Sequence, residues 1–165
     1  MIILGIDPGY AIVGYGVIKH EGNRFITMAY GAIQTPAGIP YEDRLLKIGE
    51  DLGEIIKMYK PDVLSVEDLF FTTNQKTAIA VAGARGVIIY TAKSRGLDVF
   101  SYTPLQVKQS VVGYGKAEKK QVIDMTVRIL ALEKPPKLDD TSDALALAIC
   151  HAHSKNSVYP ERTRI

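Results

Sequence analysis

The sequence predicts a mixed α/β fold, in which helices flank a central sheet of five strands. Three observations support this prediction. The 165 residues amount to roughly one domain at ~150 residues per domain. Three strand-like segments open the chain, with only tight turns between them. Two more apolar segments follow, each after a helix-length segment, and further helical segments occupy the rest of the chain.

The first three strands are expected to form an antiparallel meander. Residues 2–7 are a continuous apolar run that ends in Asp7 and is broken by a Pro-Gly pair. Residues 11–19 form the second strand, whose two glycines indicate that another backbone approaches one face closely. A turn at residues 20–23 leads into a third strand at residues 24–34.

Two helix–strand units come next. Apolar side chains recur at helical spacing from about residue 41 to residue 59, and a short apolar strand at residues 63–66 then delivers Glu67. A long helix rich in small residues is expected at 74–95, followed by a fifth strand at 97–102. Because a helix precedes each of these two strands, we expect both to run parallel to the first strand.

The last third of the chain is predicted to be helical. A Thr-Pro pair starts a short helix at residues 103–112, a basic amphipathic helix follows at 116–132, and a last helix runs over 139–153. Residues 154–165 are expected to form a flexible tail. Residues 1–153 are therefore predicted to be a single domain.

The composition excludes several classes of protein. Hydrophobic residues make up 47% and charged residues 23%, as in ordinary globular proteins. The chain contains no run of ~18 apolar residues, the length that a membrane-spanning helix needs, and the first residues carry no secretory signal pattern. The single cysteine cannot form an internal disulfide, and no cysteine cluster suggests zinc. We therefore expect a cytoplasmic protein that does not act in a membrane.

The net charge of +2 is unevenly distributed along the chain. Residues 104–137 carry seven basic and three acidic residues, a sum of +4, whereas residues 1–103 and 138–165 each sum to −1. Such a basic segment fits two interpretations: a surface that binds a polyanion such as nucleic acid, or a solvated helix face. Charge alone favours the solvated face.

Four acidic residues occupy positions that require an explanation, because two end apolar strands and two share one face of a helix. Asp7 and Glu67 each end an apolar strand, and the predicted topology places these strands side by side. Asp140 and Asp143 lie three residues apart at the start of the last helix, so they share a face. Taken singly, Asp7 has an ordinary role in a turn, and Asp140 and Asp143 have ordinary roles in helix capping. Glu67 is harder to explain, because its own segment offers no cation to pair with it.

Taken together, these acids indicate a metal site. Like charges that converge at a sheet edge repel one another, and divalent cations remove the repulsion. Oxygen ligands favour hard ions such as Mg²⁺ or Mn²⁺, and a pair of such ions promotes phosphoryl transfer. An acidic cluster next to a basic helix is the arrangement expected of a nuclease.

Other reactive side chains have simpler explanations. Phe70 and Phe71 follow Glu67 closely, and such a pair usually packs in a core, although a wedge between DNA bases is the alternative. His151 and His153 are two residues apart on a helix and point to different faces, which disfavours zinc binding. Cys150 is expected to be a buried helix residue rather than a nucleophile.

With these residues in hand, the chain resembles the RuvC family of Holliday junction resolvases. The matching segments run in order along nearly the whole chain to residue 153: Ile2–Gly9, Gly14–Ile18, Ala84–Val87, Gln106–Gln109, Val111–Gly115, Ala117–Lys119 and Asp143–Ile149, with His151 and His153. A Gly-Ile-Asp start alone is weak, since actin-like ATPases share it. The ordered set is highly specific.

The resemblance implies a ribonuclease H-like fold and a metal-dependent active site. It implies that Asp7, Glu67, Asp140 and Asp143 are catalytic and bind two Mg²⁺ ions in each subunit, for which Mn²⁺ can substitute. Asp139 also shares a face with Asp143, but the family's spacing favours Asp140, which leaves Asp139 as a cap or a residue behind the ligands.

The resemblance also implies DNA contacts and partners. It assigns DNA binding to Lys108 and Lys119, and base stacking to Phe70, with Phe71 left as the alternative ring. It implies a homodimer that nicks two opposite strands of four-way junction DNA and works with the RuvA–RuvB branch-migration complex. Small residues that repeat every four positions make the helix at 74–95 the candidate interface, unless they pack on the sheet instead.

The leading hypothesis is therefore a Mg²⁺-dependent crossover junction endodeoxyribonuclease of DNA recombination and repair. The resemblance implies paired symmetric nicks that leave 5′-phosphate and 3′-hydroxyl ends. An actin-like sugar kinase or ATPase is a second hypothesis, but such proteins need two lobes and this chain has one. A DNA-binding scaffold without catalysis is a third, which the intact set of four acids disfavours.

Overall fold

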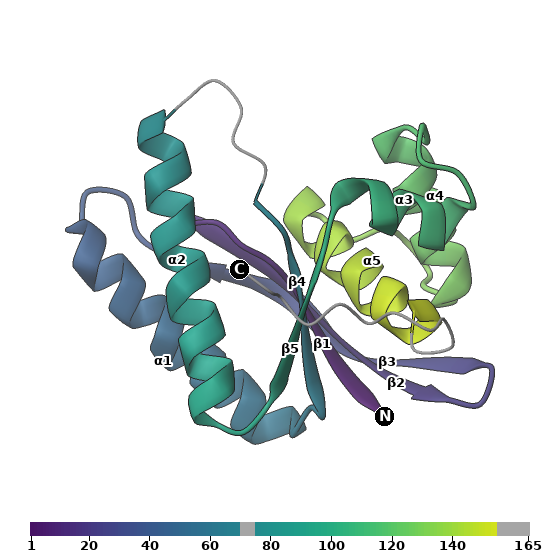
Figure 1. The fold of residues 1–165 in the computed structure, drawn as a ribbon, viewed down its shortest axis with the longest axis horizontal. Coiled ribbons are helices and arrows are strands. Elements are labelled where there is room, and N and C mark those ends of the chain that lie inside the picture. The colour runs from purple at the N-terminus through teal and green to yellow at the C-terminus, as the bar shows by residue number, and fades with distance from the viewer. Residues whose placement is uncertain (70–74, 155–165) are drawn as a thin grey trace.

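The chain folds around a five-stranded sheet with helices on both faces (Figure 1). The computed structural model describes residues 1–69 and 75–154. Helices α1 (Tyr41–Tyr59) and α2 (Gln75–Ser94) cover one face of the sheet. Helices α3 (Pro104–Val112), α4 (Lys119–Ile129) and α5 (Asp139–Ser154) lie on the other face. The predicted mixed α/β architecture is confirmed.

The strand order is β3-β2-β1-β4-β5. The strand bounds are β1 Ile2–Asp7, β2 Ile12–Glu21, β3 Arg24–Gln34, β4 Val63–Glu67 and β5 Asp98–Tyr102. As predicted, β1, β2 and β3 form an antiparallel meander, while β4 pairs in parallel with both β1 and β5. The second strand extends beyond its predicted end because the hairpin turn is confined to residues 22–23, where Gly22 adopts a φ of 58°.

Four of the five helices lie within two residues of their predicted bounds, but the basic helix is shorter than predicted. It covers Lys119–Ile129 instead of residues 116–132. Its start is fixed at Glu118, whose backbone N–H donates to the Gln121 side chain at 2.8 Å. Its end is fixed by Ala131, which has a left-handed φ of 49°. Hydrophobic spacing alone does not register such end contacts.

Helix α5 is the most deeply buried helix and packs directly on the centre of the sheet. Most of its side chains from Thr141 to Ala152 are buried. It lies so close to the sheet that a Cβ atom added at Gly5 or Gly14 would collide with its backbone. The close backbone approach predicted from the strand glycines is confirmed, and it brings the first turn of α5 against β1 and β2. Within the described ranges, no helix combines the length and apolar character that a membrane span requires.

Candidate active site

Two acidic side chains meet where β1 and β4 end. The parallel register pairs Ile6 with Val66, so Asp7 and Glu67 each follow one residue later at the same edge of the sheet. Residues two apart in a strand face the same side. Gly5 faces α5 and the Ser65 hydroxyl donates to the Leu147 carbonyl of α5, so Asp7 and Glu67 also face α5. Their carboxyl groups share a hydrogen bond, as the predicted side-by-side placement requires.

The first turn of α5 brings further acids to this edge. The Thr141 hydroxyl donates to the Gly31 carbonyl at 3.0 Å, which ties the turn to β3. The turn then places Asp140 and Asp143 near the strand ends, where both act on the charge of Asp7. The four acids predicted from the sequence therefore lie close enough to interact electrostatically.

Burial and mutual repulsion dominate the electrostatics of this cluster. Burial, followed by repulsion from Glu67, Asp143 and Asp140, raises the pKa of Asp7 to about 8. Burial and the charge of Asp143 also raise the pKa of Glu67. Burial raises the pKa of Asp143 as well, although Lys119 partly counteracts it. Because burial raises the pKa of both Asp7 and Glu67, the two carboxyl groups share a proton in their hydrogen bond.

A cation already lies at the outer side of the cluster. The Lys119 Nζ lies 3.1 Å from an oxygen of Asp143 and 3.2 Å from an oxygen of Asp139. Burial opposes the charge on Lys119, but hydrogen bonds and attraction to Asp143 and Asp139 outweigh it and raise its pKa. The family resemblance assigns Lys119 to DNA binding; in the structure its half-exposed side chain is the counter-ion of two α5 acids.

The donor set suits hard divalent cations, although a closed site is not preformed. Asp7, Glu67 and Asp143 offer partly buried carboxylate oxygens whose repulsion a divalent ion would relieve. Across residues 1–69 and 75–154, no three acidic, histidine or cysteine side chains converge tightly enough to enclose an ion as they stand. A divalent ion that binds here would displace the proton that Asp7 and Glu67 share and would compete with Lys119 for Asp143.

The remaining predicted residues lie at different distances from the cluster. Lys108 belongs to α3, which packs beside α5, and within the described part of the chain it forms no ion pair with the four acids. Phe70 and the alternative ring Phe71 lie outside the described residues. His151 is buried, with Nδ1 2.7 Å from the Tyr102 hydroxyl, whereas His153 is exposed, in agreement with the prediction that they point to different faces.

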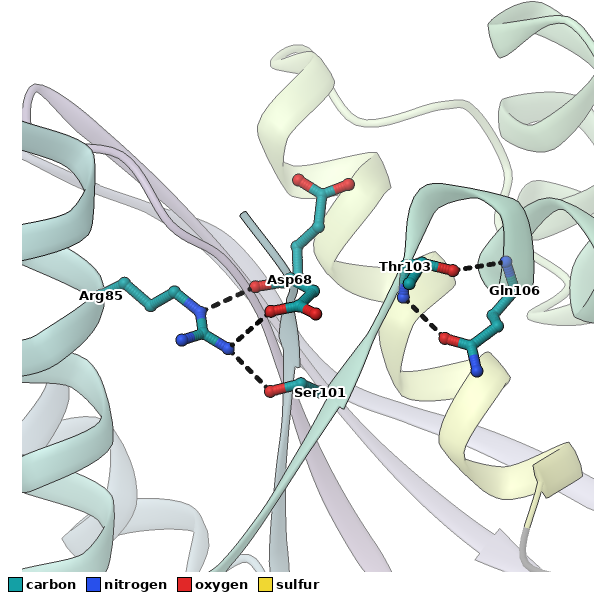
Figure 2. A network of polar contacts seen from close by, with 6 residues as sticks. Asp68, Arg85, Ser101, Thr103 and Gln106 are labelled. Carbon is teal, nitrogen blue, oxygen red and sulfur yellow. Dashed lines mark hydrogen bonds and ion pairs between the residues drawn. The ribbon is translucent and has the colours of Figure 1, made fainter. Parts of the chain in front are cut away.

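Sequence reasoning missed one residue at the site, Arg85 of α2. Its Nε donates to the backbone carbonyl of Glu67 at 3.0 Å, and its Nη2 donates to Asp68 at 3.2 Å and to Ser101 at 2.7 Å. Figure 2 shows Arg85 reaching from its helix toward Asp68 and Ser101. The motif that contains Arg85 was noticed in the sequence, but nothing there shows which strand end it reaches.

Beside this network, the Thr103 hydroxyl accepts from the backbone N–H of Gln106, which starts α3 directly after β5 (Figure 2). The predicted helix start at the Thr-Pro pair is confirmed. The cap holds the beginning of α3 close to the strand end that Arg85 contacts.

Comparison with known proteins gives concordant results. A family model described as crossover junction endodeoxyribonuclease RuvC matches residues 3–151. A crossover junction endodeoxyribonuclease RuvC of Alkaliphilus oremlandii is 55% identical over 156 residues, which are 94% of this chain and 95% of the relative. The protein of the same name from Ruminiclostridium cellulolyticum is 55% identical over 154 residues, 93% of each chain.

Solved structures agree with these relatives. The Thermus thermophilus RuvC structure superposes with a TM-score of 0.88 at 32% identity, covering 94% of this chain and 95% of that one. T. thermophilus RuvC in complex with a Holliday junction substrate superposes with a TM-score of 0.90 at 32% identity, covering 94% of each chain. The predicted ribonuclease H-like fold is confirmed by these matches.

Proposed function

The chain belongs to the RuvC family of crossover junction endodeoxyribonucleases, and on that basis we propose that it resolves Holliday junctions by paired, symmetric nicks. The observation that carries the site assignment is the meeting of Asp7, Glu67 and Asp143 at one edge of the sheet. The likeness to a relative bound to a Holliday junction supports junction DNA as the substrate.

Four carboxylates hold two Mg²⁺ ions in this proposal, with Mn²⁺ as a substitute: Asp7, Glu67, Asp140 and Asp143. When bound, two such ions supply charge neutralisation at the scissile phosphate and activation of the attacking water. Water adds to phosphorus, the bond from phosphorus to the 3′ oxygen breaks, and the leaving oxygen takes up a proton. The products are a 5′-phosphate and a 3′-hydroxyl end.

The residues of the chain prepare this step in three ways. Asp7 and Glu67 give up their shared proton, so that both become acceptors for metal. Lys119 leaves Asp143 and turns to a DNA phosphate, while Lys108 on the neighbouring helix contacts a second phosphate. Phe70 is proposed to stack on a base next to the cut.

The dimer of this proposal uses the outer face of α2. Ala84, Ile88 and Ala92 of this helix are buried. Gly86 lies on the exposed side, and a Cβ added there would meet open space. The alternative that all of the small residues pack on the sheet is therefore wrong, because Gly86 does not pack there. Two large apolar side chains on α2 are also exposed, Ile79 by 71% and Tyr90 by 74%.

Two further parts of the proposal have narrower support. Residues 1–153 form one nuclease domain, which the family match over residues 3–151 supports. The cooperation with the RuvA–RuvB complex rests on the family resemblance alone. The tail at residues 154–165 lies outside the described residues, apart from Ser154.

The test of the proposed function compares a labelled four-way junction with a duplex of matched sequence, each with and without Mg²⁺. We expect paired nicks near the crossover of the junction only, and only when the metal is present. Ligation of the products by DNA ligase checks for 5′-phosphate and 3′-hydroxyl ends. Equal cutting of the duplex, or metal-independent cutting, would contradict the proposal.

A further inference from the structure

The backbone of Glu67, which carries one of the proposed metal ligands, lies at a point where β4 is paired with one neighbouring strand instead of two. The ladder between β1 and β4 ends at the pair Ile6–Val66, while the ladder between β4 and β5 continues to the pair Glu67–Tyr102. Glu67 is therefore paired on the β5 side alone. A strand end that is paired on one side has more freedom than the interior of a sheet, so some other contact must fix the direction of this carboxylate.

Arg85 supplies contacts at this point. Its Nε donates to the Glu67 carbonyl at 3.0 Å, while the next backbone N–H, that of Asp68, donates to the Tyr102 carbonyl at 2.9 Å. Both polar groups of the peptide unit that joins Glu67 to Asp68 are therefore hydrogen-bonded. This peptide unit cannot rotate without breaking one of the two bonds.

The guanidinium group connects three separate parts of the chain. Nη2 donates to the Ser101 hydroxyl at 2.7 Å on β5 and to an Asp68 oxygen at 3.2 Å, while Nε holds the end of β4 from α2 (Figure 2). The Arg85 side chain is only 14% exposed. Its donors lie in a rigid plane, so the bond from Nη2 to Asp68 is enough to fix the position of Nε at the Glu67 carbonyl.

We propose that Arg85 is a positioning residue for the nuclease reaction: it fixes the direction of the Glu67 carboxylate by holding the Glu67 backbone carbonyl. Its contact with Glu67 is through this backbone oxygen, and its carboxylate partner is Asp68, so it acts by geometry and leaves the Glu67 carboxylate available. The inference rests on the proposed metal-dependent function of Glu67.

The test uses Arg85→Lys, which keeps the charge but has one nitrogen in place of the planar fork. Ser101→Ala is the matched control, because it removes a partner of Nη2 and leaves the bond from Nε to Glu67. Each protein is assayed for Mn²⁺ affinity by calorimetry, for junction affinity, for single-turnover cleavage and for thermal unfolding.

We expect Arg85→Lys to weaken Mn²⁺ binding and slow single-turnover cleavage by about 10- to 100-fold, the usual effect of removing an orienting contact behind a metal ligand. Junction affinity should stay within about twofold, since phosphate contacts set it. Ser101→Ala should keep the wild-type Mn²⁺ affinity. A lower unfolding temperature for Arg85→Lys with unchanged Mn²⁺ affinity and cleavage would overturn the proposal.

A double variant separates this inference from the proposed function. If Arg85 acts through Glu67, Arg85→Lys should change Mn²⁺ affinity in the wild-type background and leave it unchanged in Glu67→Gln. The same loss in both backgrounds would show that Arg85 acts elsewhere. If Glu67→Gln itself retained full Mn²⁺ affinity and cleavage, the proposed function of Glu67 would fail, whatever Arg85 does.

If Arg85→Lys does not fold, the wild-type protein still provides a test. The Arg85 Nε–H signal in ¹⁵N spectra should shift when Mg²⁺ is added, because the metal binds the carboxylate of the residue whose carbonyl this group holds. The shift should be absent in Glu67→Gln. If the chemical shift of this signal in the wild-type protein did not change when Mg²⁺ is added, the proposal would be overturned.

Discussion

The two sides of the acidic cluster are held in place by different means. On the sheet side, Asp7 and Glu67 end parallel strands, and the strand register and Arg85 fix their backbones. On the helix side, Asp143 is tied to Lys119 by an ion pair at 3.1 Å, and the Lys119 side chain is 53% exposed. The sheet side is thus preorganised, whereas the helix side is held by a cation that water, metal or DNA can displace. We therefore expect that a bound metal would rearrange the helix side more than the sheet side.

Removal of a sheet-side carboxylate should have the largest effect. We expect Asp7→Asn and Glu67→Gln to reduce single-turnover cleavage by at least about 10³-fold, because the lost group cannot be replaced within a rigid strand end. Junction binding should persist, since removing negative charge weakens repulsion of phosphate. Gel-shift and cleavage assays on one junction measure both. Parallel loss of binding and cleavage would mean that these acids are structural.

The pH dependence of stability should come next in size. The folded pKa of Asp7 is raised to about 8, so between its ordinary pKa of 3.8 and that value the folded chain holds a proton that the unfolded chain has released. In EDTA, the proton held by the folded chain therefore makes the free energy of unfolding fall as pH rises through that window, by at most about 1.4 kcal/mol per pH unit. Thermal unfolding from pH 5 to pH 8.5 measures the trend.

Two controls show whether Asp7 causes the trend. Asp7→Asn should flatten the pH dependence and stabilise the metal-free protein at pH 8, because the asparagine stays neutral. Saturating Mg²⁺ should flatten it as well, by binding the ionised carboxylates. A slope that persists in Asp7→Asn would assign the trend to other groups.

Much of the sheet side of the site could be predicted from the sequence, because its residues are identified by patterns within short segments of the chain. An apolar run that ends in an acid identifies Asp7 and Glu67 as strand ends, and a helical crossover implies that their strands are parallel neighbours. Arg85 and the contact between Lys119 and Asp139 could not be predicted in this way. They join residues on different elements, and hydrophobic periodicity carries no information about which polar side chains meet. The predicted basic helix was too long for a related reason, since its ends depend on Glu118 and Ala131.

On the helix side, removal of Lys119 should have opposite effects on two ligands. Lys119→Met should strengthen Mn²⁺ binding several-fold, because two half-exposed ion pairs of about 0.2–1 kcal/mol each no longer compete with the metal. The same change should weaken junction binding and flatten the slope of log K against log salt by about one unit. Lys108→Met is the control, with weaker junction binding and unchanged Mn²⁺ affinity. If Lys119→Met and Lys108→Met had the same Mn²⁺ affinity and the same junction affinity, Lys119 would not compete with the metal.

The smallest effect is expected at Asp139, and it decides which neighbouring acid is a ligand. Asp139 is the more exposed of the two, with 69% of its side chain accessible, and it forms an ion pair with Lys119. Asp140 is half-buried and is among the charges that raise the pKa of Asp7, whereas Asp139 acts on Asp143. Asp139→Asn should therefore change Mn²⁺ affinity by less than about twofold, because it loses one exposed ion pair worth at most about 1 kcal/mol to Lys119, while Lys119 keeps Asp143.

Asp140→Asn is the matched variant, one residue away in the same helical turn and with the same loss of charge. It should lower Mn²⁺ affinity by at least tenfold, as expected when a metal ligand is removed rather than a neighbour. Both variants lose an acid that favours the N-terminal turn of α5, at about 0.3–1 kcal/mol, so their unfolding temperatures should fall together. Calorimetric titration with Mn²⁺ then separates them by ligation, because the exposed ion pair that Asp139→Asn also loses is worth too little to produce a tenfold change. If Asp139→Asn lost the greater affinity, the ligand would be Asp139, and the helix side would bind metal through the acid that now holds Lys119.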